Sequence, residues 1–169
     1  MEKQDLFDLI EIHFDEVLDK SSHQGQELRR QFDMFKNRKI KKEYITLVKG
    51  HPEKTGTISS PIVRHPADPR KMMCNYVDGR EAQTNYKVER YFDECALITV
   101  YPLTGRTHQI RVHFAAIGHP VLGDSLYGTS SKLIKRQALH AHKLSFDFEG
   151  KFFEFTSPIP EDMKKLIDS

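Results

Sequence analysis

Short runs of β-forming residues, each ended by glycine, proline or aspartate, recur along most of the chain and constrain its fold more than any other feature. They cover residues 44–49, 57–62, 72–77, 82–91, 96–101, 138–148 and 152–156. Glu149-Gly150, between the last two runs, is typical of a hairpin turn. The pattern predicts an α+β fold with a mixed, mainly antiparallel sheet and flanking helices.

Helical periodicity is confined to a few stretches: residues 3–19, 26–37, 108–117 and a short last helix that opens at Pro160. In the third stretch, an apolar stripe recurs at i, i+4 and i+7 (Ile110, Phe114 and Ile117). Thr107 is expected to cap its start, and Gly118 to take the left-handed conformation at its end. Residues 1–27 are interpreted as an acidic helical extension, and residues 28–169 as the main domain.

Composition points to an ordered protein that works inside the cell. The chain has 169 residues, of which 38% are apolar and 30% charged, so it is long enough for a hydrophobic core and is not of the disordered class. Its apolar runs are too short for a membrane span, and the N-terminal sequence is not typical of a signal peptide. With only Cys74 and Cys95 a disulfide framework is not expected, and we predict reduced thiols and a cytoplasmic location.

Charge is unevenly distributed along the chain. Residues 1–27 hold two Lys or Arg against eight Asp or Glu, whereas residues 28–72 hold twelve against four. A basic block of this kind indicates a polyanionic partner, although a solvated surface explains the same charges.

The segment from Leu103 to Gly128 carries the clearest chemical signal. A tight turn leads directly into a helix, and the free N–H groups at a helix start attract phosphate. The spacing predicts that Arg106, His108 and Arg111 face one pocket. The three histidines of the segment are separated by five and six residues, which does not stack them on one helix face, so we predict no metal site.

This segment closely resembles the active-site motif of the RluA-like family of RNA pseudouridine synthases. Further stretches match in the family's order from about Leu28 to the C-terminus: residues 32–44, 47–50, 56–58, 61–62, 79–84, 136–141 and 158–163. The resemblance implies the C-terminal part of the family's catalytic domain, in truncated form. It also implies an enzyme that isomerises uridine to pseudouridine in RNA, ribosomal RNA in the first place, without a cofactor or metal.

The resemblance also implies roles for single residues. Tyr44 matches the tyrosine that stacks on the flipped uracil, Arg111 the arginine that pairs with the catalytic aspartate, and Leu139 an apolar residue that lines the pocket. Contacts with RNA are expected from basic and polar side chains: Lys36, Lys39, Lys41, Lys42, Lys49, Arg106, His108 and Gln109.

The family's nucleophilic aspartate loop is matched only loosely, by residues 17–25, which makes Asp19 the candidate nucleophile. Without a buried aspartate beside it, Arg111 is expected to be an unpaired cation, which is costly in a pocket. Three hypotheses therefore stay open: a truncated or rearranged synthase, a non-catalytic RNA-binding module, and a gene remnant that folds poorly. No oligomeric state follows from the sequence.

Overall fold

The computed structural model describes residues 40–148 and 150–169. The predicted helices at residues 3–19 and 26–37, together with the boundary at residue 27, lie outside this part of the chain. So do three of the candidate residues, Asp19, Lys36 and Lys39.

The main element of the fold is a six-stranded antiparallel sheet in the order β2-β5-β6-β1-β7-β8. Its strands are β1 (Lys41–Lys49), β2 (Thr55–Ile58), β5 (Thr84–Tyr91), β6 (Cys95–Pro102), β7 (Leu139–Phe148) and β8 (Lys151–Thr156). A separate hairpin consists of β3 (Ile62–Arg64) and β4 (Met72–Cys74). The two described helices are α3 (Gln109–Ala116) and α4 (Glu161–Asp168). The predicted α+β class with a mainly antiparallel sheet is therefore confirmed.

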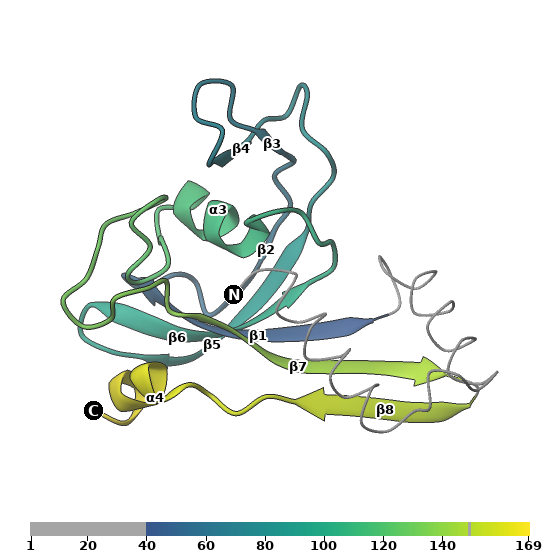
Figure 1. Ribbon diagram of the computed structural model, residues 1–169, viewed down its shortest axis with the longest axis vertical. Coiled ribbons are helices and arrows are strands. Elements are labelled where there is room, and N and C mark those ends of the chain that lie inside the picture. Colours follow the sequence, from purple (N-terminus) through teal and green to yellow (C-terminus); the bar gives the residue numbers. More distant parts are fainter. Residues whose placement is uncertain (1–39, 149) are drawn as a thin grey trace.

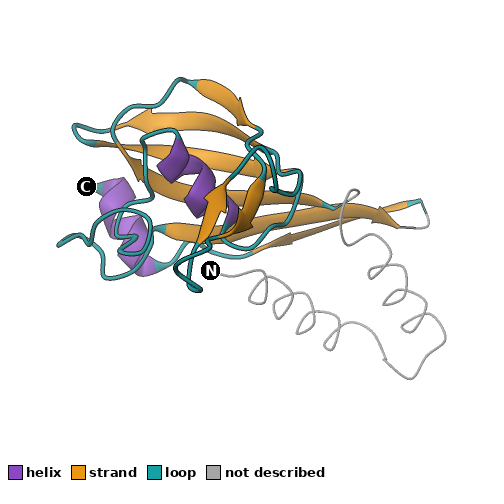
Figure 2. Ribbon diagram, turned by 90° about the horizontal axis from the view of Figure 1, so that it is seen from above, coloured by secondary structure: helices purple, strands orange, loops and turns teal. Residues whose placement is uncertain are grey.

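The sheet has a layer on each side. Figure 1 shows α3 and the β3–β4 hairpin above the sheet and α4 below it, and in Figure 2, viewed from above, α3 lies over the strands. The central strands β1 and β6 are covered on both sides, because consecutive residues such as Leu47 and Val48, at 1% and 0% exposure, are buried. Phe114 of α3 packs edge-on against Tyr86 of β5, with ring centroids 5.2 Å apart. These contacts fix α3 over the sheet and so fix the position of the residues just before it.

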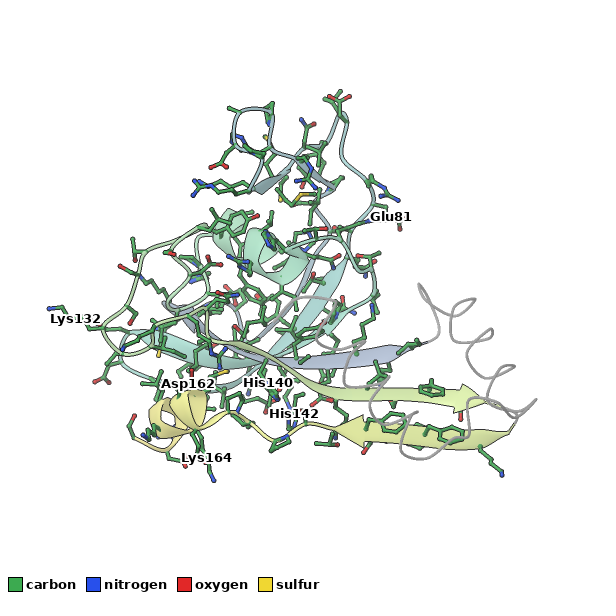
Figure 3. The ribbon with its side chains drawn as sticks, in the orientation of Figure 1. Glu81, Lys132, His140, His142, Asp162 and Lys164 are labelled. Carbon is green, nitrogen blue, oxygen red and sulfur yellow. The ribbon has the colours of Figure 1, made fainter. Side chains whose placement is uncertain are left out.

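Two histidines of β7 lie on the α4 side of the sheet (Figure 3). His140 Nε2 and His142 Nδ1 lie 3.1 and 2.8 Å from the Ser157 carbonyl oxygen, and since a carbonyl only accepts, both nitrogens donate. His140 is buried, and its burial lowers the pKa of the imidazole.

Two of the predicted strands, at residues 57–62 and 72–77, do not extend over the whole of their β-forming runs. The run at residues 57–62 is divided between β2 and β3, which belong to different sheets. Pro61 lies at the break, and proline has no N–H to donate to a strand ladder. The run at residues 72–77 ends at Cys74, because the Asn75 side-chain oxygen accepts the N–H groups of Val77 and Asp78 and folds the chain into a turn.

The predicted helix at residues 108–117 is one residue shorter at each end. Thr107 does not cap it: His108 precedes the helix with a φ of 54°, and no side chain caps the start. Ile117 follows the helix and is 38% exposed, so only Ile110 and Phe114 of the predicted stripe are buried; Val112, outside that stripe, is buried as well. Gly118 has a φ of 84°, as predicted.

The C-terminal predictions agree with the structure. β7 pairs with β8 around Gly150, which has a φ of 75°, and α4 begins directly after Pro160. Neither described helix has the length and apolar composition that a membrane crossing requires. Cys74 and Cys95, the only cysteines of the chain, are free thiols whose pKa burial raises.

Candidate active site

A pocket opens between the residues that precede α3 and the neighbouring strands β1 and β7. Segments far apart in the sequence line it: Lys42, Tyr44, Pro102, Thr104, Gly105, Arg106, Thr107, His108, Gln109, Ile110, Arg111, Gln137 and Leu139. The structure thus brings together most of the residues that the sequence marked as candidates. Their roles in catalysis and RNA binding stay predictions.

The strand side of the pocket is formed by β1 and β7. Tyr44 pairs with Ala141 in the sheet register, and Thr46 pairs with Leu139, so Tyr44 and Leu139 come from adjacent strands. Both are buried, at 9% and 4% exposure. They present apolar surface and an aromatic ring to the pocket, which suits a flat apolar group such as a base. Lys41 is exposed and is not among the lining residues, unlike its neighbour Lys42.

The loop that leads into α3 is organised by the amide of Gln109. The amide oxygen accepts the Thr104 hydroxyl at 2.7 Å and the Arg106 N–H at 3.0 Å. The amide nitrogen donates to the Gln83 carbonyl at 3.0 Å and to the Thr84 hydroxyl at 2.9 Å. Two lone pairs and two N–H groups are the full capacity of an amide. Gln109 therefore supports the loop, and any direct bond to RNA has to replace one of these four.

The same network continues into the core through His113. Its Nε2 donates to the Ser60 carbonyl at 2.8 Å, so its Nδ1 accepts from the Thr84 hydroxyl, also at 2.8 Å. Burial lowers the pKa of this imidazole, which keeps it neutral. His119 donates from Nδ1 to the Lys49 carbonyl at 2.9 Å. These two histidines are satisfied polar packing, and within residues 40–148 and 150–169 no group of three metal-binding side chains occurs.

Arg111 forms a two-point ion pair with Asp124. Its Nε and Nη2 lie 2.7 and 3.0 Å from the two carboxylate oxygens. The pair is buried, since the side chains of Arg111 and Asp124 are 11% and 0% exposed. Burial alone raises the pKa of Asp124, but the Arg111 guanidinium and the N–H groups of Leu126 and Tyr127 outweigh it and hold that pKa below its usual value. The expectation of an unpaired Arg111 is therefore wrong, because Asp124 neutralises it.

Tyr127 connects this ion pair to the start of α3. The Arg111 guanidinium carbon lies 5.1 Å from the centre of the Tyr127 ring, within cation–π range. The Tyr127 hydroxyl lies 2.8 Å from His108 Nδ1 and accepts the Met72 N–H at 2.8 Å. His108 is the one described residue other than glycine with a positive φ, and strain of this kind is common at functional sites.

Sequence reasoning assigned no role to Asp124 or Tyr127. Their local signal is the pair of flanking glycines, Gly123 and Gly128, of which Gly123 has a φ of 78°. That signal predicts a turn, but it does not reveal the partner of the carboxylate.

Basic side chains line the pocket. Arg106 is partly exposed, and its Nε donates to the Glu81 carbonyl at 2.7 Å, which ties the loop to the segment that precedes β5 (Glu81 is labelled in Figure 3). Lys42 is a second basic residue of the lining, whereas the charge of Arg111 is balanced by Asp124. Such a pocket attracts a phosphate-bearing ligand.

Comparison with protein families and known proteins gives a consistent result. Residues 20–116 match the model of a family described as RNA pseudouridylate synthase. An uncharacterized RNA pseudouridine synthase of Chloroflexus aurantiacus is 42% identical over 146 residues, which cover 84% of this chain and 46% of that protein. The ribosomal large subunit pseudouridine synthase D of Nitrosomonas europaea is 38% identical over 156 residues, which cover 84% and 45%. The chain thus spans less than half the length of these curated relatives.

Solved structures show the same likeness. Human RNA pseudouridylate synthase domain containing 1 superimposes with a TM-score of 0.69 at 27% identity, over 89% of this chain and 71% of that one. Human RNA pseudouridylate synthase domain containing 4 gives a TM-score of 0.62 at 23% identity, over 86% and 66%, which is a likeness of fold alone.

Proposed function

The chain belongs to the RNA pseudouridine synthase family, and from this premise we propose that it isomerises uridine to pseudouridine in RNA. In this reaction the N1–C1′ glycosidic bond breaks, the base turns, and a C5–C1′ bond forms. The hydrogen on C5 leaves to solvent, and N1 takes up a proton. No oxidant, reductant or metal is required.

The observation that carries the proposal is the convergence of Tyr44, Arg111 and Leu139 on one pocket. A uridine must leave the base stack to be reached, and unstacking costs a few kcal/mol that the pocket has to offset. The Tyr44 ring and the Leu139 side chain offer flat apolar contact to the base. Arg111 is proposed to donate hydrogen bonds to an anionic group, either a carboxylate nucleophile or an RNA phosphate.

We propose Asp19 as the nucleophile. The support is its place in the stretch at residues 17–25, which loosely resembles the aspartate loop of the family. Arg106, His108, Lys41 and Lys42 are proposed to contact RNA, with the two lysines acting on the sugar-phosphate backbone. Ribosomal RNA is the proposed substrate, since the name of the Nitrosomonas relative specifies the ribosomal large subunit, and the cytoplasm is the proposed location.

The test is tritium release from RNA labelled at C5 of uridine, because C5 loses its hydrogen only when the new bond forms there. Release by the wild-type chain, lost in Tyr44→Leu and Asp19→Asn, supports the proposal. Asp162→Asn is the matched control, since it makes the same change of charge in an exposed ion pair on α4. Absence of release from a folded wild-type chain contradicts it.

A second candidate is an RNA-binding module without catalysis. It is favoured by the start of the family match after Asp19, the candidate nucleophile. RNA binding that Lys42→Ala weakens, with no tritium release at any enzyme concentration, is the result that this candidate requires. A chain that neither folds cooperatively nor binds RNA is instead the gene remnant.

A further inference from the structure

Asp124 and Tyr127 hold Arg111 in place from outside the pocket. Neither is a lining residue, whereas Arg111 is. The carboxylate of Asp124 takes two hydrogen bonds from the guanidinium, at 2.7 and 3.0 Å, and the Tyr127 ring faces the same group at 5.1 Å. Arg111 is thus held by a two-point ion pair and by a cation–π contact.

The turn that carries these two residues is itself held in place. The Asp124 carboxylate accepts the N–H groups of Leu126 and Tyr127 at 3.1 and 3.2 Å. The backbone carbonyl of Asp124 accepts the Gly128 N–H at 2.9 Å. The carboxylate therefore has four donors, two from its own turn and two from Arg111. Its position is set by the backbone and transmitted to the guanidinium.

The geometry selects one edge of the guanidinium. Asp124 engages Nε and one N–H of Nη2, and the group is planar and rigid, so the direction of its opposite edge is fixed as well. An arginine side chain without such contacts samples many rotamers, and ordering it has an entropic cost. When Asp124 and Tyr127 order it in the folded protein, the chemical step does not bear that cost.

We infer that Asp124 and Tyr127 are positioning residues for the isomerisation, acting through Arg111. The inference rests on the proposed function for its kinetic part. It assigns Asp124 a role distinct from that of the nucleophile: its carboxylate is buried and committed to four donors, and it orients the cation rather than attacking the sugar.

The first test separates orientation from simple charge neutralisation. Asp124→Glu keeps the charge but moves the carboxylate by about one methylene, and a displacement of roughly 1 Å costs about 100-fold in rate. We expect single-turnover tritium release to fall about 100-fold while the affinity for RNA changes less than threefold. If Asp124 only neutralises charge, Asp124→Glu retains both the rate and the affinity, and the inference is overturned.

The second test uses a matched pair at Tyr127. Tyr127→Phe and Tyr127→Leu both lose the hydroxyl that binds His108 and Met72, but only the leucine variant loses the ring over Arg111. The leucine variant is expected to be about tenfold slower than the phenylalanine variant. Equal rates contradict a role for the ring.

A third measurement does not depend on activity. In an NMR spectrum of the arginine Nε–H groups, the Arg111 signal, assigned by its loss in Arg111→Lys, should exchange slowly with solvent in the wild type. In Asp124→Asn and Tyr127→Leu it should exchange faster. An unchanged signal overturns the inference. If that signal responds as expected but the wild type releases no tritium, the proposed function fails while the positioning of Arg111 stands.

Discussion

Two arginine–aspartate pairs of nearly equal geometry lie in opposite environments, and they allow the effect of burial to be measured. Arg111 and Asp124 make two hydrogen bonds at 2.7 and 3.0 Å, with side chains 11% and 0% exposed. Arg136 and Asp162 make two at 2.9 and 2.8 Å, with side chains 38% and 43% exposed. The same change, aspartate to asparagine, can be made in each.

The expected losses of stability differ by several-fold. Asp124→Asn removes the buried negative charge that pairs with Arg111, and breaking a buried pair costs about 3–5 kcal/mol. Because the asparagine oxygen still accepts the N–H groups of Leu126 and Tyr127, we expect about 3 kcal/mol. Asp162→Asn breaks an exposed pair, which should lower the stability by about 0–1 kcal/mol. It also removes a negative charge from the first turn of α4, at about 0.3–1 kcal/mol, so we expect about 1 kcal/mol in total.

Urea unfolding followed by far-UV circular dichroism measures both losses, provided that the slope of free energy against urea is the same for the three proteins. Added salt should reduce the effect of Asp162→Asn and leave that of Asp124→Asn nearly unchanged, since buried pairs are screened little. If the two losses of stability agree within about 0.5 kcal/mol, or if the loss at Asp162 is larger, burial does not determine how much these pairs contribute to stability.

Three further outcomes are expected. Burial lowers the pKa of both His113 and His140, so below pH ~6.5 the unfolded chain binds more protons than the folded one. The free energy of unfolding should then fall by up to about 1.4 kcal/mol per pH unit for each histidine until the lowered pKa is reached; a urea midpoint that stays constant between pH 7.5 and 5.5 contradicts this. Gly118→Ala and Gly123→Ala both place alanine at positive φ, and this strain should lower the stability of each variant by about 1–2 kcal/mol. Only the Cβ at position 123 lies 2.3 Å from a backbone oxygen, so Gly123→Ala should lower the urea-derived stability by a further ~1–3 kcal/mol, and equal losses would count against the steric argument. Lys42→Ala should reduce the slope of log affinity for RNA against log salt by about 1 in filter binding, whereas an unchanged slope removes Lys42 from the RNA contacts.

The parts of the fold that depend on neighbours in sequence could be predicted. Alternating β-formers and the turn at Gly150 define the β7–β8 hairpin, and Gly118 ends α3 because only glycine adopts a positive φ at little cost. The break at Pro61 was missed, although proline there was visible. Its consequence depends on which strand lies alongside: β2 pairs with β5, whereas β3 pairs with β4.

In the candidate site, too, the sequence predicts local features but not the contacts between distant segments. Arg106 and His108 lie before α3 rather than on it, so helical spacing does not bring them to the pocket; the loop held by Gln109 does. The partner of Arg111 could not be found from the sequence, because the chain leaves α3 and returns through the turn at Asp124 before the two groups meet. Long-range contacts of this kind have no local signature.

The place of β1 in the sheet has a consequence for the order of events in folding. β1 lies between β6 and β7, and the Thr46 hydroxyl donates to the Ala138 carbonyl across 92 residues of chain. Closing so long a loop is slow, because its entropy is lost before the favourable contacts between the strands have formed. The pocket therefore gains its second wall late, after β1 and β6 have paired. An RNA that binds only the finished pocket makes contacts that are absent from the folding transition state, so it slows unfolding and leaves the folding rate unchanged.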